Sequence, residues 1–307
     1  MPLSLSYSAL SFSSVQLILK RIASVVYIRT FLLTLSAMVA FAGNSLLCRA
    51  ALTSTHIDAA SFTTVRLLSG AVILWLLALI RSRSNAIGGN WLSALALFVY
   101  AAGFSFSYIH LTAAVGALIL FGVVQVTMIG YGLWTGERMR VPQIVGFVLA
   151  FTGLIGLLLP GISAPPLVGA LLMLSSGVAW GVYSLRGKVS SDALKVTAGN
   201  FIRTVPMALA LSVLLFVHTS LDAKGVLYAV LSGAVASGMG YVIWYAALPF
   251  LKATTAATVQ LSVPIIAALG GVAFLKEPLT LRLIVAAIAI IGGIALVIFT
   301  GRRSGKN

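Results

Sequence analysis

Acidic residues are scarce in this sequence, which has five Asp and Glu against twenty Lys and Arg, and only 8% of its residues are charged. In soluble domains about a quarter of all residues are charged, so a soluble fold is excluded. The acidic residues also lie outside the long apolar runs, so we expect no transmembrane carboxylate relay for protons or sodium. They are Asp58, Glu137, Asp192, Asp222 and Glu277.

Cysteine pairs and common enzyme motifs are also missing. The single cysteine, Cys48, excludes an intrachain disulfide. No HExxH zinc motif occurs, and the Ser-Gly pairs at Ser176 and Ser237 lack the glycine two positions earlier that a serine nucleophile motif has. We therefore expect no catalytic residues, no metal and no cofactor, and we do not expect an enzyme.

Apolar residues, by contrast, make up 60% of the chain, and its mean hydropathy is +1.11. They form runs of transmembrane length without strict alternation, and lipid admits only helices or closed barrels. The sequence predicts an all-α polytopic membrane protein with ten transmembrane helices. The predicted spans are 30–52, 59–80, 91–109, 112–133, 141–159, 167–186, 197–217, 224–247, 253–274 and 281–299.

The chain divides into four predicted regions. Residues 1–28 are Ser-rich and carry Lys20 and Arg21 late, so we interpret them as a cytoplasmic or interfacial N-terminal leader rather than a cleaved signal peptide. Residues 29–160 form a first five-helix repeat, and residues 161–300 form a second. Residues 301–307 form a basic cytoplasmic tail.

The net charge of +15 is carried mainly by short connectors, where it indicates topology rather than nucleic-acid binding. With a cytoplasmic N-terminus, fourteen Lys and Arg fall on the inner side, and only Lys224, Lys276 and Arg282 fall on the outer side. The positive-inside rule then places both termini in the cytoplasm. We expect a multi-pass protein of the bacterial inner membrane that acts as a monomer on a small-molecule solute.

The two halves of the chain resemble each other. A shift of 140 residues places Glu137 on Glu277, and a shift of 137 places Arg66 on Arg203. Because each half has five spans, an odd number, the second half must cross the membrane in the opposite sense. Inverted repeats of this kind are typical of transporters, whose halves enclose a site near the middle of the bilayer.

Two hairpin segments carry a family resemblance. The segments GERMRVPQIVGFVLAFTGLIGLLL and LKEPLTLRLIVAAIAIIGGIALVI each pass from a polar turn with one Glu into a Gly-containing apolar helix. Together with the five-plus-five arrangement, they resemble the drug/metabolite transporter (DMT) superfamily and its EamA-type exporters over residues 30–299. Amino-acid exporters of the YddG type are the nearest comparison, although no motif distinguishes them. The resemblance implies an exporter that works by alternating access around a central cavity.

Polar and aromatic residues at helical spacing mark the predicted substrate path. In the sixth span Ser176, Trp180 and Tyr183 follow i, i+4 and i+7, and the eighth span repeats this spacing. Rings with an attached OH or NH suit a solute that is partly apolar and partly polar. The candidate cavity residues are Asn44, Ser45, Tyr108, Gln125, Trp180, Tyr183, Tyr241, Trp244 and Tyr245.

These candidates have structural alternatives. The rings could pack between helices, and Asn44 and Gln125 could bridge helices by hydrogen bonds. Trp and Tyr residues near the ends of spans suit the interfacial belt of a membrane protein. We assign four such residues to that belt: Trp75, Trp91, Tyr100 and Trp134.

Charged residues and one proline supply further candidates. Arg49 could attract an anionic group of the solute at the cavity mouth, and His110 could sense pH. Pro264 is expected to bend the ninth span and to act in gating. Arg66 and Arg203 are expected to extend toward lipid headgroups.

The sequence therefore predicts a transmembrane exporter of small metabolites, with amino acids as the preferred substrate class. Two alternatives stay open. One is an exporter of drugs or other metabolites, although the lack of a membrane carboxylate argues against cationic drugs. The other is a membrane receptor or assembly subunit that does not transport a solute.

Overall fold

The computed structural model describes residues 12–81, 88–136, 138–161, 164–187, 192–247, 250–251 and 259–301. These residues form helices with short connectors, and no strand occurs among them. Eight of the helices are long and apolar enough to cross a membrane, and two shorter apolar helices lie at Ser262–Leu275 and Leu281–Val297. The predicted all-helical, multi-pass membrane protein is confirmed at this level.

The first half of the chain contains α1 (Phe12–Ser54), α2 (Ala59–Arg81), α3 (Trp91–Tyr108), α4 (Ala113–Trp134) and α5 (Val141–Leu158). The second half contains α6 (Leu167–Gly187), α7 (Ala193–Leu214), the 3-10 turn η1 (Phe216–His218), α8 (Ala223–Val230), η2 (Leu231–Met239), α9 (Gly240–Ala247), α11 (Ser262–Leu275) and α12 (Leu281–Gly301). The segment η2 is a π-helix, and α8, η2 and α9 together make one apolar span, Ala223–Ala247.

One predicted boundary differs from the structure. No break separates the predicted leader from the first span, because α1 is one helix from Phe12 and no glycine or proline occurs in residues 12–42. The helix α11 begins at Ser262, after a turn at Leu261 and two helical residues, Val259 and Gln260. Residues 252–258, Glu137 and residues 302–307 of the predicted tail lie outside the described residues.

Side-chain caps fix where several helices begin. Four residues each accept a hydrogen bond from a backbone N–H in the first turn of the following helix. Such caps satisfy N–H groups that have no partner within the helix. The capping residues are Asn90, Thr112, Asp192 and Asp222.

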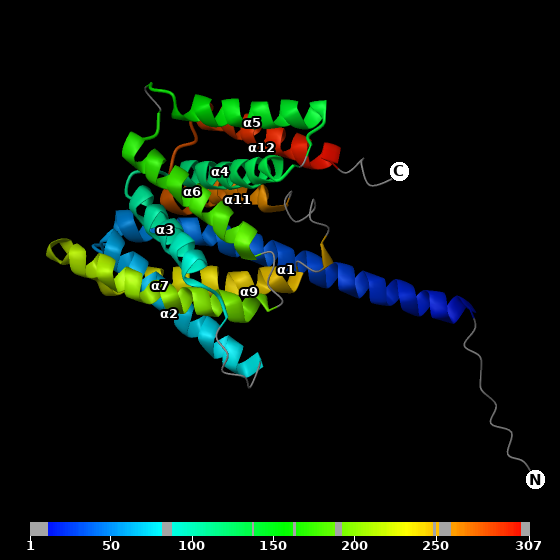
Figure 1. The fold of residues 1–307 in the computed structure, drawn as a ribbon, viewed down its shortest axis with the longest axis horizontal. Coiled ribbons are helices and arrows are strands. Elements are labelled where there is room, and N and C mark those ends of the chain that lie inside the picture. The colour runs from blue at the N-terminus through cyan, green and yellow to red at the C-terminus, as the bar shows by residue number, and fades with distance from the viewer. Residues whose placement is uncertain are drawn as a thin grey trace, which may run out of the picture.

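Helices of the two halves pack against one another in pairs. The helix α2 packs on α7, α5 on α12 and α3 on α6, while α1 packs on α8, η2, α9 and α11. Figure 1 shows α5 and α12 side by side along one edge of the bundle. Glycines permit this close crossing, because a Cβ atom on Gly146 would lie only 2.5 Å from the carbonyl oxygen of Gly293.

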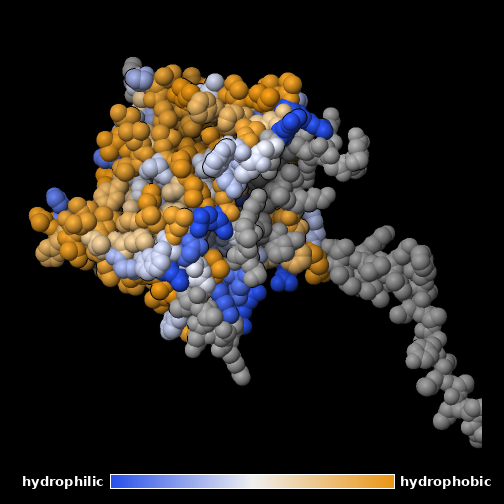
Figure 2. Space-filling model, viewed as in Figure 1, coloured by the Kyte–Doolittle hydropathy of each residue, from blue (hydrophilic) through white to orange (hydrophobic). Residues whose placement is uncertain are grey.

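The two ends of the bundle differ in polarity. The terminal end, as we call it, carries the α2–α3, α4–α5 and α6–α7 connectors, and α1 begins and α12 ends there (Figure 1). The opposite end is the distal end. Figure 2 shows hydrophilic residues gathered toward the terminal end, beside a broad hydrophobic surface that suits contact with lipid. Basic residues near the terminal end include Arg81, Arg138, Arg140 and Arg186.

Candidate functional site

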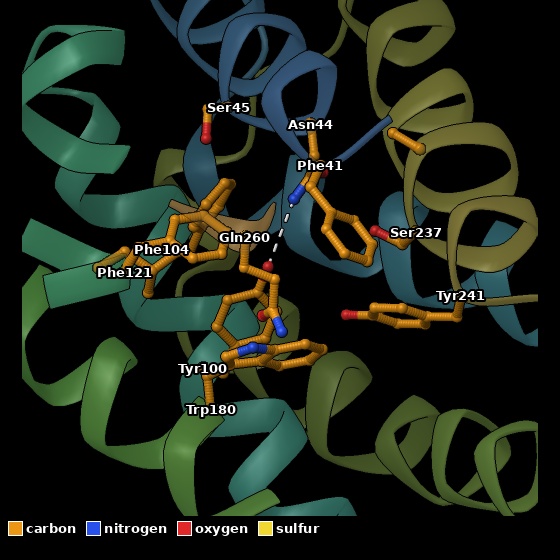
Figure 3. Close-up of a pocket in the computed structure, with 12 residues that line it drawn as sticks. Phe41, Asn44, Ser45, Tyr100, Phe104, Phe121, Trp180, Ser237, Tyr241 and Gln260 are labelled. Atoms are coloured by element: carbon orange, nitrogen blue, oxygen red, sulfur yellow. Dashed lines mark hydrogen bonds between the residues drawn. The ribbon is translucent and has the colours of Figure 1, made fainter. Parts of the chain in front are cut away.

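A cavity lies inside the bundle, between helices of both halves (Figure 3). Its open volume is about 20 Å³, which is enough for roughly one water molecule. A metabolite therefore requires the helices to move apart. The lining residues come from α1, α3, α4, α6, η2, α9 and the segment before α11: Phe41, Asn44, Ser45, Tyr100, Phe104, Leu120, Phe121, Trp180, Ala236, Ser237, Tyr241 and Gln260.

Aromatic rings form much of the cavity wall. Trp180 stacks on Tyr241 with ring centroids 5.3 Å apart, and Tyr100 lies 4.7 Å from Trp180. Phe41 approaches Tyr241 at 5.9 Å. These four rings come from α1, α3, α6 and α9, so helices of both halves meet at the cavity. Rings of this kind offer an apolar solute group a large contact area.

A buried polar network crosses the cavity wall. The Nδ2 atom of Asn44 donates to the hydroxyl of Tyr100 at 3.3 Å (Figure 3), and the hydroxyl of Ser232 donates to Oδ1 of Asn44 at 2.6 Å. Ser176 donates to the backbone carbonyl of Tyr100 at 2.7 Å. The network joins α1, α3, α6 and η2. It holds the Tyr100 ring and hydroxyl in a fixed place beside the cavity.

Arg66 extends into this network from α2 and is only 2% exposed. Its Nη2 atom donates to the Tyr100 hydroxyl at 3.1 Å, and its Cζ atom lies 4.6 Å from the centroid of the Phe104 ring. Its Nη1 atom is buried without a hydrogen-bond partner. The expectation that Arg66 reaches lipid headgroups is wrong, because two aromatic rings of α3 hold its guanidinium inside the bundle.

Arg49 lies at the distal end, where its charge is already paired. Its Nε atom lies 2.9 Å from Oε1 of Glu277, and its Nη1 atom donates to the carbonyls of Tyr108 and Ile109. The other carboxylate oxygen of Glu277 accepts the backbone N–H of Ala113 at 2.8 Å. Arg49 is therefore poorly suited to attract a solute anion. It instead ties α1 to the α11–α12 connector.

A second cavity, of about 30 Å³, lies toward the terminal end. Tyr183 and Tyr245 line it together with Arg186 and Asn200. Arg203 lies near this end of α7, where its Nη1 atom donates to the backbone carbonyls of Gly88 at 2.6 Å and Gly199 at 2.9 Å. Backbone carbonyls rather than headgroups therefore take up the hydrogen bonds of Arg203.

The nine predicted cavity residues fall into three groups. Four line the first cavity, namely Asn44, Ser45, Trp180 and Tyr241. Two line the second cavity, namely Tyr183 and Tyr245. Three line neither cavity but are buried between helices, namely Tyr108, Gln125 and Trp244.

The packing of Tyr108 and Trp244 shows why they lie behind the cavity wall. The Tyr108 ring meets the edge of the Phe104 ring at 4.7 Å, and Trp244 meets Phe41 at 6.3 Å. Phe104 and Phe41 both line the first cavity. Tyr108 and Trp244 therefore support lining rings rather than face the opening.

Pro264 and His110 also lie away from the cavities. Pro264 is the third residue of α11; Val259 and Gln260 are also helical, and Leu261 between them and α11 is a turn. The chain therefore departs from a regular helix just before Pro264, and the gating role of Pro264 stays a prediction. His110 is exposed in the connector between α3 and α4 and lines neither cavity.

Sequence reasoning missed Tyr100 as a cavity residue and Arg66 as the buried partner of its hydroxyl. Tyr100 was assigned to the interfacial belt, but it is 5% exposed and lines the cavity. Its spacing of four residues from Phe104 placed both on one face of α3 and was the signal that could have identified it. Arg66 gave no such signal, because the apolar neighbours of an intramembrane arginine do not show which way it extends.

This chain is similar to a known protein family and to several known proteins. The model of the EamA-like transporter family matches residues 167–299. The uncharacterized protein PA1977 of Pseudomonas aeruginosa is 56% identical over 88% of this chain and 94% of its own length. The uncharacterized transporter YoaV of Bacillus subtilis is 24% identical over 79% of this chain and 88% of its own.

Solved structures include the same fold. One crystal structure has a TM-score of 0.63 at 18% identity, and the match covers 90% of this chain and 98% of the other.

Within the described residues, no three His, Cys, Asp or Glu side chains lie together in a way that could hold a metal ion.

Proposed function

We propose a transport function from one premise, that this chain belongs to the EamA-like transporter family. The family and the membrane-spanning helices make the protein a multi-pass membrane transporter rather than an enzyme. Our proposal is that it exports small metabolites, with amino acids as the preferred class, by alternating access around the first cavity. The observation that most supports this proposal is that the cavity lies between the two halves and combines aromatic rings with fixed polar groups.

The packing of the helices supports two inverted five-helix repeats, residues 29–160 and 161–300. The contact of α3 with α6 has its counterpart in the contact of α1 with α8, η2 and α9. The contact of α4 with α6 likewise matches that of α11 with α1. The pairs α2–α7 and α5–α12 join equivalent helices, as a two-fold axis in the membrane plane requires.

The charge distribution supports a terminal end in the cytoplasm of a bacterial cell and a distal end outside its inner membrane. With the terminal end in the cytoplasm, fourteen of the twenty Lys and Arg residues of the sequence fall on that side. Both chain termini are then cytoplasmic. A single chain encloses the cavity, which supports a monomer as the transporting unit.

The ion pair at the distal end supports a closed state of a transport cycle. Arg49 and Glu277 join the two halves at that end, and the cavity below holds about one water molecule. Export then requires the pair to separate so that solute leaves outward. No step is assigned to His110, because it is exposed away from the cavity.

Transport by the purified protein in proteoliposomes tests the proposal. Vesicles are loaded with labelled amino acids, cationic drugs or nucleotide-sugars, and efflux is followed. We expect amino-acid efflux that is lost in Trp180→Ala but kept in Trp134→Ala, since Trp134 is 85% exposed and lines neither cavity. Drug efflux without amino-acid efflux would favour the drug exporter, and no flux together with a stably co-purified protein would favour a receptor or assembly subunit.

A further inference from the structure

We infer that the first cavity recognises a carboxylate group of its solute through the hydroxyl of Tyr100, which Arg66 supports from behind the cavity wall. This rests on the proposed function only in taking the cavity as the solute site. The inference adds a substrate class, which is small organic acids with an apolar part, and it assigns the recognising residues. The argument has three steps.

The first step concerns the proton of the Tyr100 hydroxyl. A tyrosine hydroxyl both accepts and donates hydrogen bonds. The Tyr100 oxygen accepts one from Asn44 at 3.3 Å and another from Arg66 at 3.1 Å. Its own proton is donated to none of the described groups. Tyr100 lines the cavity, so this proton is available to a solute oxygen there.

The second step concerns the charge of Arg66. The guanidinium is buried, its Nη1 atom has no partner, and the ion pair found among the described residues belongs to Arg49 and Glu277 instead. A buried cation without a counter-ion is costly. Arg66 also polarises the Tyr100 hydroxyl, to which it donates, and so makes that hydroxyl a stronger hydrogen-bond donor. An anion in the cavity would reduce the cost of the buried charge.

The third step concerns the rest of the cavity wall. Ser237 adds a buried hydroxyl without a partner, and Tyr241 points its hydroxyl into the cavity (Figure 3). None of the described residues that line the cavity is acidic. The wall thus offers hydrogen-bond donors to an anion, with the charge of Arg66 behind Tyr100, but no carboxylate to an ammonium group. Rings such as Phe41 and Trp180 are left to contact the apolar part of the solute.

A purely structural role is the competing explanation for Arg66. An arginine that only braces helices is expected to find acceptors for its donors, as Arg203 does with the carbonyls of Gly88 and Gly199. The unpartnered Nη1 atom of Arg66 favours an exchangeable ligand instead. The matched pair of arginines therefore provides the control.

Binding of three compounds with one phenethyl skeleton tests the inference. They are 3-phenylpropionate, phenylalanine and phenethylamine, titrated by calorimetry into the full-length protein in detergent. We expect the two carboxylates to bind about tenfold or more tightly than the amine, the effect of one charge-assisted hydrogen bond. Equal binding of the acid and the amine would overturn the inference.

Variants assign the effect to residues. Arg66→Gln should weaken the binding of 3-phenylpropionate about 10- to 100-fold and leave the binding of phenethylamine unchanged. Tyr100→Phe keeps the ring and should weaken the binding of 3-phenylpropionate about tenfold. Arg66→Lys should keep part of the preference for the acid. Arg203→Gln should keep all of it. Equal losses in Arg66→Gln and Arg203→Gln would overturn the assignment, and Tyr100→Phe and Arg66→Lys give the same decision if Arg66→Gln does not fold.

Two further results separate the possible failures. The first result is competition by chloride. If chloride displaces 3-phenylpropionate from the wild type but has no effect on Arg66→Gln, the ligand is an inorganic anion and the solute assignment is overturned. If chloride displaces nothing, the solute assignment is supported. Acid preference without efflux in proteoliposomes would contradict the proposed export but support this inference. Efflux of acids and amines at equal rates would support export and contradict the inference.

Discussion

Arg66 and Arg203 stand at equivalent positions in the two halves, 137 residues apart, but their surroundings differ. Arg66 is enclosed by the rings of Tyr100 and Phe104 and keeps one donor atom unpartnered. Arg203 is half-buried and bonds two backbone carbonyls near the terminal end. One arginine is placed beside the cavity, and the other fastens the α2–α3 connector to α7.

One difference between the halves accompanies this contrast. The shift of 137 residues that pairs Arg66 with Arg203 also pairs Tyr100 with Ser237. The phenol of Tyr100 reaches the guanidinium of Arg66, whereas the short hydroxyl of Ser237 has no partner and faces the cavity. Similar halves can therefore divide their tasks, with one arginine left for the solute and the other used for structure.

The largest effect is expected where the backbone of α2 behind Arg66 meets η2. A Cβ atom on Gly233 would collide with the backbone carbonyl of Arg66 and the hydroxyl of Ser69. The equivalent position in the first half is Ala96, which already has a Cβ atom and is half-buried. Gly233→Val should therefore prevent folding, because the contact is with backbone that cannot turn away.

Ala96→Val is the matched control for this variant. It should cost less than about 1 kcal/mol, as for a partly exposed position. Size-exclusion chromatography and thermal unfolding in detergent measure both variants. Similar stabilities for Gly233→Val and Ala96→Val would contradict the expected difference in packing between the two halves at these positions.

Replacing each arginine by methionine should affect stability differently at the two positions. Arg66→Met removes a buried, unpaired charge and keeps much of the side-chain volume, so we expect an equal or higher Tm than that of the wild type. Arg203→Met removes two hydrogen bonds to the carbonyls of Gly88 and Gly199, which should lower stability by about 1–3 kcal/mol. Differential scanning fluorimetry decides. A Tm drop for Arg66→Met as large as that for Arg203→Met would make both arginines structural.

Sequence reasoning reached much of the fold because the bilayer leaves few choices. Apolar length and short connectors are local features, and they predicted most helices within a few residues. The turn at Leu261 before α11 was missed, because an apolar run alone does not show where a helix is interrupted.

The candidate site could be predicted only in part. Helical spacing placed Trp180 and Tyr241 on faces that meet at the cavity. Tertiary packing decided the rest: Arg66 turns inward because the rings of α3 cover it, and Arg49 is held by Glu277, which lies 228 residues away in sequence. No local pattern carries such long-range partnerships.

The next prediction concerns the distal end, and it tests whether the Arg49–Glu277 ion pair keeps the bundle closed over Arg66. Glu277→Gln weakens the link to Arg49 and should raise the population of the open state about tenfold, as expected for loss of a charge-assisted hydrogen bond. Cys48, the single cysteine, is fully buried next to Arg49 in sequence. Its labelling by a membrane-impermeant thiol reagent should accelerate accordingly.

Arg282→Gln is the control for this labelling. Arg282 also lies at the distal end but donates only to the carbonyls of Gly156 and Leu159. Its loss should leave the labelling rate of Cys48 unchanged. If Glu277→Gln labels no faster than Arg282→Gln, the ion pair does not hold the distal end closed.

Low pH should destabilise the distal end but not the contacts that Arg203 makes at the terminal end. This is the smallest effect we expect. Burial raises the pKa of Asp58, but hydrogen bonds from Ser61, Ser220 and Ala60 outweigh it and leave the pKa lowered. The Asp58 carboxylate joins the α1–α2 connector to the segment before α8 through the backbone N–H of Ser220.

A lowered pKa in the folded state fixes the sign of this effect. The stabilisation by Asp58 is fully present above its unfolded pKa of about 3.9 and is lost as the pH falls below that value. Thermal unfolding should therefore show a modest loss of Tm from pH 5 to pH 3, which Asp58→Asn reduces. Arg203→Met should keep the full loss, because the bonds of Arg203 to backbone carbonyls do not titrate in this range. If Asp58→Asn shows the same loss as the wild type, other carboxylates control the acid response, and the contrast between the two ends does not extend to pH.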